Sequence, residues 1–309
     1  MRIFYGSSHP KLGHAIAEYL NAKAGEMKTS KFSCGETYAR VTETIRGHDC
    51  YIIQAIGQQP NDDYMELFLM MDALKRSSAR SINIVLPYFG YSRQDKKSAP
   101  REPISARLIA DLLQAVKLDR LITLDLHSDQ IQGFFNVPVD HLTSIPLFYD
   151  YFKKKNFQNL AVVAPDTGRA KFAKKLSDKL NGELVIMHKT RPTHNVAEIV
   201  NVVGEVKGKT ILLVDDMIDT AGSVTSGLNA LRDLGCNEDI YLAATHAIFS
   251  GQAEERLNSS GFKEIVVTDS IPQKKNNIKN LTVLSTASLL GEVIKRNHEN
   301  KSINDLIGD

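Results

Sequence analysis

Two adjacent carboxylates and a turn of small residues stand close together between residues 210 and 223. The apolar run Ile211–Val214 leads into Asp215 and Asp216, and a small-residue turn then opens a helical pattern. Small residues let backbone N–H groups curl around an anion, and the helix N-terminus after them adds positive potential. A phosphate held there, beside carboxylates that accept hydrogen bonds from sugar hydroxyls, describes a site for a phosphorylated pentose. The residues predicted to form it are Asp215, Asp216, Asp219, Thr220, Ala221, Gly222 and Ser223.

A second group of polar side chains follows another apolar run. Residues 91–97 read YSRQDKK and concentrate cations beside an amide and a carboxylate. Arg93 is suited to paired contacts with phosphate oxygens, and Gln94 can read the edge of a base or a ribose. This segment therefore predicts contacts with a nucleotide.

Two further candidates follow strand-like runs, and a third group lies in a polar segment. His127 and Asp166 each come just after such a run. Neither spacing alone predicts a metal. If Mg²⁺ binds here, its preference for oxygen ligands and retained waters favours Asp166 as a direct ligand and His127 as a residue acting through water. Lys189 and Arg191 lie in HKTRPTHNVAE, which is typical of an exposed turn or flap. A closing cationic flap neutralises charge and excludes water during phosphoryl transfer.

Each of these patterns has a structural alternative. The acidic segment could be a capped helix after a strand, although adjacent carboxylates repel each other unless something positive or hydroxylated compensates. The segment around Arg93 could be a solvated loop, and His127 could be a structural histidine. Lys189 and Arg191 could be solvated surface cations.

The elements that must position these residues alternate along the whole chain. Helical patterns separate the β-branched runs, which indicates parallel sheets covered on both faces. We expect an α/β protein with two domains of similar build, residues 1–142 and 143–285, and a helical C-terminal segment, 286–309, that packs on one of them. The strand-like runs are Cys50–Ile56, Ser81–Leu86, Leu121–Leu126, Leu160–Ala164, Leu184–Met187, Thr210–Val214, Ile240–Thr245 and Glu264–Thr268. The helical patterns are Asp62–Ser77, Pro103–Val116, Ser223–Leu234 and Thr286–Asn297.

Composition narrows the class of protein. The 309 residues are 42% hydrophobic and 24% charged, as in ordinary globular proteins. The net charge of +2 gives no argument for nucleic acid. The three cysteines form neither a disulfide framework nor a zinc spacing, which favours a reducing cytoplasm. No run of apolar residues is long enough to predict a membrane span.

The order of several distinctive strings identifies a family. The chain resembles ribose-phosphate pyrophosphokinases over nearly its whole length. The matching strings are FSCGE (32–36), MELFLMMDALKR (65–76), INIVLPYFGYSRQDKK (82–97), REPISA (101–106), LDLHSDQIQGFF (124–135), PVDHL (138–142), APDTG (164–168), KTRPTHNVAE (189–198) and VDDMIDTAGS (214–223).

The resemblance implies a fold, a reaction and roles for the residues. It implies two type I phosphoribosyltransferase-like domains that transfer the β,γ-diphosphate of ATP to the 1-hydroxyl of ribose 5-phosphate with Mg²⁺, giving phosphoribosyl pyrophosphate and AMP. Lys189 would be the catalytic lysine, and Arg191 would contact the sugar phosphate or the transition state. ATP would be bound by Cys34, Gly35, Glu36, Arg93, Gln94 and Asp95, the first three from a neighbouring subunit, and Mg²⁺ by His127 and Asp166. The family also implies a homo-oligomer, a hexamer.

Three positions depart from the pattern that this resemblance sets. Cys34 stands where family members commonly have Asp. The usual Pro-Asp-x-Gly-Gly turn, with Arg four residues after its first Gly, here has Arg169 for the second Gly and Phe172 for that Arg. We expect Arg169 or Lys171 to supply the missing charge to the diphosphate. The alternative is that Arg169 points to solvent and merely begins a helix.

Two other functions stay open at this stage. A phosphoribosyltransferase that consumes phosphoribosyl pyrophosphate would share the 215–223 segment, but it gives no reason for residues 91–97. A non-catalytic regulatory subunit of the same family would explain the altered turn, but the presence of Lys189, His127 and Asp166 argues against it.

Overall fold

The chain forms two compact units. The computed structural model describes residues 1–190, 199–273 and 277–307, without the side chains of residues 189–190 and 199–200. The first unit contains Met1–Thr143, Ser270–Pro272 and Ser285–Asp309, and the second contains Ser144–Asp269 and Gln273–Leu284. Within the described part of the chain, no helix is both long and apolar enough to cross a membrane.

The first unit is built on a parallel sheet of five strands in the order β1-β4-β5-β6-β7. These strands are β1 (Arg2–Tyr5), β4 (Asp49–Ile53), β5 (Ser81–Val85), β6 (Arg120–Leu124) and β7 (Val139–Leu142). The helices of this unit are α1 (Pro10–Tyr19), α2 (Pro60–Arg76), α3 (Ser105–Ala115), the short 3₁₀ helix η1 (Asp129–Phe134) and the C-terminal α8 (Ala287–His298). A separate antiparallel hairpin is formed by β2 (Met27–Lys31) and β3 (Thr37–Val41).

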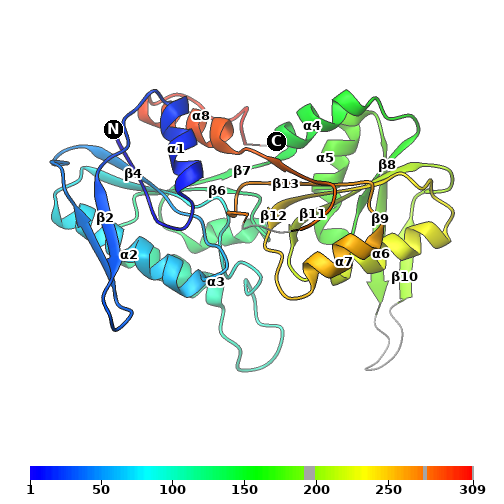
Figure 1. Cartoon of the computed structure of the whole chain (residues 1–309), viewed down its shortest axis with the longest axis horizontal. Coiled ribbons are helices and arrows are strands. Elements are labelled where there is room, and N and C mark those ends of the chain that lie inside the picture. The colour runs from blue at the N-terminus through cyan, green and yellow to red at the C-terminus, as the bar shows by residue number, and fades with distance from the viewer. Residues whose placement is uncertain (191–198, 274–276, 308–309) are drawn as a thin grey trace. The chain divides into compact units, whose positions relative to one another are not determined.

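The C-terminal helix belongs to this first unit. Figure 1 shows α8 beside α1, where Tyr19 donates a hydrogen bond to Glu292 over 2.9 Å. A Cβ atom at Gly291 would lie 2.5 Å from the Tyr19 ring, so glycine is what lets the two helices approach here. At the far end of α8, Asn297 donates to Asp140, which also binds Arg120, both at 2.6 Å. These contacts tie the end of the chain to strands β6 and β7.

The second unit is built on a sheet of seven strands in the order β10-β9-β8-β11-β12-β13-β14. All neighbours are parallel except β10 and β9. The strands are β8 (Leu160–Ala164), β9 (Glu183–Thr190), β10 (Ile199–Val203), β11 (Thr210–Ile218), β12 (Ile240–Ala247), β13 (Glu264–Thr268) and β14 (Leu281–Leu284). The helices are α4 (Ile145–Phe152), α5 (Ala170–Leu180), α6 (Gly222–Asp233), α7 (Ala253–Ser260) and the 3₁₀ turns η2 (Lys153–Lys155) and η3 (Thr167–Arg169).

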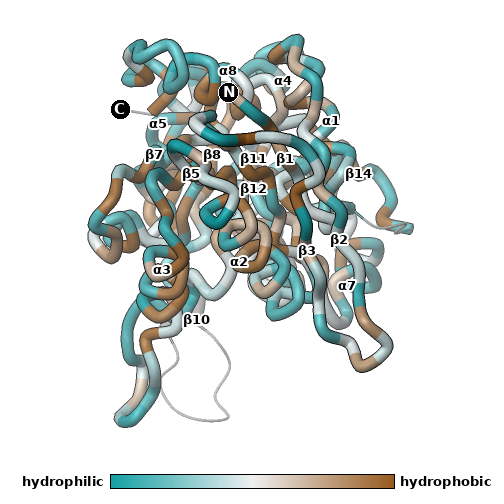
Figure 2. Tube along the Cα trace, turned by 90° about the vertical axis from the view of Figure 1, so that its left-hand side faces the viewer, coloured by the Kyte–Doolittle hydropathy of each residue, from teal (hydrophilic) through white to brown (hydrophobic). Residues whose placement is uncertain are grey.

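Helices cover both faces of this seven-stranded sheet. Leu212 and Val214 of β11 pack with α4 and α5, whereas Ile211 and Leu213 pack with α6 and α7. This division follows from the pleat of a strand, which directs successive side chains to opposite faces. In Figure 2 the hydrophobic colour gathers on central strands such as β8, β11 and β12. Parallel sheets buried on both faces confirm the predicted α/β class.

Strand β11 is longer than the sequence suggested. Its apolar run ends at Val214, but the strand continues to Ile218, so Asp215 and Asp216 lie inside it. Strand β12 makes this possible because it pairs with β11 as far as Ile218 and Ala247, which satisfies the backbone on that side. On the other side, pairing with β8 stops at Leu213 and Val163. The flank of β11 next to the acidic pair is therefore open to the turn that follows β8.

The hairpin β2–β3 was not among the predicted strands. Its first strand reads MKTSK, and only two of its five residues are even partly buried. A strand that is largely exposed to solvent on both faces has no alternation of apolar and polar residues from which it could be predicted.

The contacts of Asp140 with Arg120 and Asn297 give a test of stability. Asp140→Ala should lower the free energy of unfolding by about 2–4 kcal/mol, because it leaves Arg120 and Asn297 without their shared buried carboxylate. Asp72→Ala is the matched control, since its pair with Arg76 is exposed on α2 and should contribute about 0.5 kcal/mol or less. Urea unfolding of both variants measures the difference. Equal, small losses would show that the network does not anchor α8.

Candidate functional site

The side chains of the acidic pair lie close together. The N–H of Asp216 donates to an Asp215 carboxylate oxygen at 2.8 Å, and Arg169 approaches both carboxylates. Burial is the main reason that the pKa of Asp215 is raised well above its ordinary value, and the neighbouring Asp216 raises it further. The positive charge of Arg169 opposes this shift.

Arg169 reaches the acidic pair from the turn after β8. Its Nη2 atom lies 2.9 Å from an Asp216 oxygen, and its Nε atom lies 4.0 Å from an Asp215 oxygen. The Arg169 side chain is only 13% exposed, so the alternative that it points to solvent is wrong. Its guanidinium carbon also lies 5.8 Å from the centre of the Phe172 ring. The two departures from the expected turn therefore contact each other.

Two residues that the sequence did not predict, Ser250 and Arg256, hold the loop after β11 in place. The Ser250 hydroxyl donates to the Asp219 carboxylate, and the Ser250 N–H donates to the Asp219 carbonyl at 2.9 Å. Arg256 of α7 donates to the carbonyl of Thr220 at 2.9 Å. In a trans peptide the following N–H points the opposite way, so that of Ala221 is directed away from Arg256. No local pattern reveals these braces, because both residues come from a distant part of the chain.

Ala221 itself adopts a conformation that favours anion binding. Its φ of 61° is left-handed, and it immediately precedes the first residue of α6, Gly222. Successive N–H groups at such a turn point in one direction and form a concave anion site, which the start of the helix reinforces. Thr220 and Ser223 are exposed beside it. The predicted residues 219–223 thus form one continuous loop next to Asp215.

Asp166 lies at the end of β8, on the same edge of the sheet. Its side chain is exposed, and one carboxylate oxygen accepts the N–H of Arg169 at 3.2 Å, which caps the turn η3. Mg²⁺ takes few protein oxygens and keeps waters or substrate phosphates as its other ligands. A single exposed carboxylate such as Asp166 fits that requirement. Within residues 1–190, 199–273 and 277–307, no group of three or more His, Cys, Asp or Glu side chains could hold a metal ion.

The structure describes only part of the predicted pair Lys189 and Arg191. The backbone of Lys189 is near the end of β9, three residues beyond Ile186, which pairs with Ala164 at the end of β8. This places its backbone at the same edge of the sheet as Asp166. The Lys189 side chain and the whole of Arg191 lie outside the described residues.

The candidates of the first unit gather at one edge of its own sheet. Residues 91–97 follow β5, and His127 follows the neighbouring strand β6, where Leu124 N–H donates to the carbonyl of Pro87 at 3.2 Å. Arg93 and His127 are exposed. Gln94 is tied to the start of α3, since its side-chain oxygen accepts the Ser105 hydroxyl. Asp95, in the same loop, is half-buried.

The segment 34–36 occupies the tip of the hairpin β2–β3. Cys34 and Glu36 are exposed there, and Gly35 has a φ of 95° that a residue with a side chain rarely adopts. Phe32, at the same tip, is 55% exposed and packs edge-on against Tyr38. The structure thus presents this tip at the surface of the first unit, apart from its five-stranded sheet.

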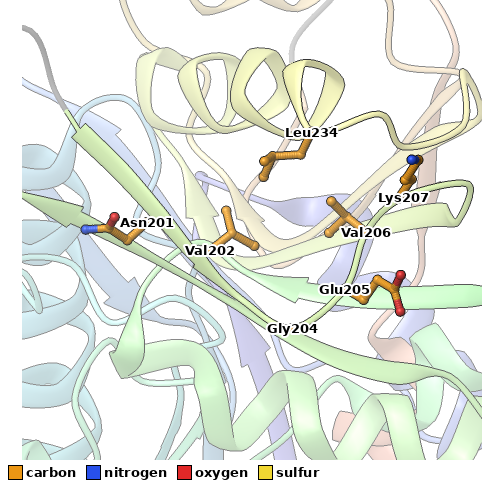
Figure 3. A pocket seen from close by; sticks show the side chains of 7 residues that line it. All are labelled: Asn201, Val202, Gly204, Glu205, Val206, Lys207 and Leu234. Carbon is orange, nitrogen blue, oxygen red and sulfur yellow. The ribbon is translucent and has the colours of Figure 1, made fainter.

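A surface hollow of about 400 Å³ lies elsewhere in the second unit. Figure 3 shows Val202, Val206 and Leu234 around it, with Lys207 and Glu205 at its rim. Val206 and Lys207 precede β11, so the hollow lies at the amino-terminal end of that strand, opposite the acidic pair. Ligands of parallel sheets bind at the carboxyl ends of the strands, so this hollow is not the candidate site.

Comparison with known proteins agrees with this arrangement. A family model described as the N-terminal domain of ribose phosphate pyrophosphokinase matches residues 1–116, and one described as a phosphoribosyl synthetase-associated domain matches residues 192–308. The ribose-phosphate pyrophosphokinases of Oceanobacillus iheyensis and Bacillus subtilis are each 47% identical over 308 residues, covering 99% of this chain and 96% of theirs. The crystal structure of phosphoribosylpyrophosphate synthetase from Mycobacterium smegmatis superposes with a TM-score of 0.90 at 41% identity, covering 97% of this chain and 99% of that one.

The similarity extends through both units and confirms two phosphoribosyltransferase-like domains as the fold. The chain belongs to the ribose-phosphate pyrophosphokinase family.

Proposed function

We propose that this protein is a ribose-phosphate diphosphokinase. It transfers the β,γ-diphosphate of ATP to the 1-hydroxyl of ribose 5-phosphate and gives phosphoribosyl pyrophosphate and AMP. The observation that carries the proposal is the full-length similarity to relatives that bear this name, over 99% of the chain. The acidic pair beside an anion-binding loop supports it independently, since that combination suits a phosphorylated sugar.

The sugar phosphate occupies the loop of β11 and α6. Asp219, Thr220, Ala221, Gly222 and Ser223 surround the 5-phosphate with N–H and hydroxyl donors. Asp215 accepts hydrogen bonds from the ribose hydroxyls, because it lies near the end of the strand that leads into this loop, with Asp216 close by. Arg191 adds a cation to the sugar phosphate or the transferring group.

The nucleotide is held by the first unit and a second copy of the chain. Arg93 contacts phosphate oxygens, while Gln94 and Asp95 contact the base or ribose. The exposed hairpin tip with Cys34, Gly35 and Glu36 reaches the adenine bound by a neighbouring subunit. A site shared in this way requires a homo-oligomer. We propose that it is a hexamer and that the protein is located in the cytoplasm.

Asp166, directly, and His127, through water, would hold Mg²⁺ together with the substrate phosphates. The bound ion would neutralise the phosphate charge that develops during transfer. Lys189 adds its own positive charge to the transferring diphosphate.

One assay separates this function from its rivals. The protein with ATP, ribose 5-phosphate and Mg²⁺ should release AMP and phosphoribosyl pyrophosphate in equal amounts. A non-catalytic subunit of the family would release neither. A phosphoribosyltransferase would instead release diphosphate from phosphoribosyl pyrophosphate and a base, without needing ATP.

The assignment of substrates to the two units has its own test. Asp215→Ala should raise the Kd for ribose 5-phosphate by about 10- to 150-fold, the effect of losing a hydrogen bond to a charged group. The Kd for ATP should stay within about twofold. Calorimetry measures both constants, and Asp178→Ala, an exposed carboxylate on α5, is the control. Weakened ATP binding with normal sugar binding would reverse the assignment.

The catalytic role of Lys189 predicts a kinetic effect. Lys189→Ala should lower kcat by about 10²–10³-fold, as loss of one preorganised group that stabilises developing charge does. The Kd for ATP should change little, because the lysine is proposed to act on charge that develops only in the transition state. Steady-state kinetics and equilibrium binding check the two parts. Near-normal kcat would remove Lys189 from the catalytic groups.

A further inference from the structure

Arg169 is held in one place by groups on several sides. Its own N–H is bound by the Asp166 carboxylate at 3.2 Å, which fixes the backbone of the turn. Its guanidinium faces Asp216 at 2.9 Å and lies over the ring of Phe172. That ring is 8% exposed and packs edge-on against Phe148, which is fully buried in the core. A cation fixed in this way orients whatever it binds.

The acidic pair needs such a cation. The Asp215 and Asp216 side chains are 15% and 6% exposed, so water screens their mutual repulsion poorly. Arg169 forms an ion pair with each member of this acidic pair. Removing one partner of a buried ion pair leaves the other charge uncompensated, and the side chain then moves or takes up a proton.

Unequal distances from Arg169 give the two carboxylates different tasks. Asp216 is the one that anchors the guanidinium. Arg169 lies nearer to Asp216 than to Asp215, at 2.9 Å against 4.0 Å. A fixed cation 4.0 Å from Asp215 favours the ionised form against the effect of burial, and that distance leaves the carboxylate able to accept hydrogen bonds from a ligand.

We propose that Arg169, anchored by Asp216 and Phe172, is a positioning residue that holds Asp215 ready for the ribose hydroxyls. Arg169 and Phe172 act as one unit in place of the Gly and Arg expected at these two positions. Residues three apart at the start of a helix lie on the same side, so a guanidinium supplied from position 169 does the work of one supplied from position 172. This inference deepens the proposed function and rests on it for the identity of the sugar.

The inference differs from a direct role in diphosphate binding. A guanidinium that faces the transferring diphosphate would alter kcat and leave the binding of ribose 5-phosphate unchanged. A guanidinium that positions Asp215 alters the affinity for the sugar first.

The decisive experiment exchanges the two residues. Arg169→Gly should raise the Kd for ribose 5-phosphate by about 10- to 150-fold, with the KM for ATP within about twofold. The double variant Arg169→Gly with Phe172→Arg should recover sugar binding to within about fivefold of the parent, because it returns a guanidinium to the pair. Arg169→Lys should lie between the parent and Arg169→Gly, since a point charge replaces the planar fork. Lys174→Ala, an exposed change on α5, should leave both constants unchanged.

Calorimetric binding of ribose 5-phosphate to each variant is the primary measurement, and thermal unfolding shows whether each variant is folded. Sugar affinity that stays normal in Arg169→Gly would overturn the inference, and so would equal losses in Arg169→Gly and the double variant when both are folded. If Arg169→Gly does not fold, the ordering of parent, Arg169→Lys and the double variant decides instead. The parent's release of AMP is measured separately, so failure of the proposed function is recognised independently of these affinities.

Discussion

The second unit depends on the unequal ends of two neighbouring parallel strands. Strand β8 ends at Ala164, whereas β11 runs on to Ile218 with only β12 beside its last residues. The turn after β8 therefore folds against the free flank of β11. This brings Arg169 to Asp216 and places Asp166 at the same edge. A β8 strand longer by a few residues would pair with that flank and leave no room for the turn.

The same constraint explains how two adjacent carboxylates are tolerated in a largely buried position. Burying a charge is costly unless a partner compensates for it. Here the partner comes from the turn η3, which is itself fixed because Asp166 caps it. Phe172 covers the other side of the guanidinium and joins it to the core through Phe148. Packing on Phe172, the cap from Asp166 and the ion pair with Asp216 thus all fix the position of Arg169.

The position of Arg169 then gives the two carboxylates different surroundings. Asp216 lies 2.9 Å from the guanidinium, and Asp215 lies 4.0 Å from the Arg169 Nε atom. The loop that opens α6 is held by Ser250 and Arg256, and the Ala221 N–H is directed away from Arg256. In the proposed site, one of these adjacent carboxylates anchors Arg169 and the other binds the sugar. We regard this separation as the basis of the proposed sugar-phosphate site.

The sequence by itself determined the α/β class and the family, and it located the acidic segment and the small-residue turn of the proposed site. These follow from local patterns, namely apolar runs, helical spacing and a turn of small residues, which neighbouring residues are enough to create. It missed the length of β11, because only pairing with β12 supports Asp215 and Asp216 inside a strand. It missed the wet hairpin β2–β3, which has no apolar face to mark it. The sequence pattern also marked Arg169 as unusual, but it did not identify Asp216 as the partner of Arg169. Which carboxylate Arg169 meets is decided by strand order and register, which bring residues far apart in the chain together, and only the tertiary structure sets these.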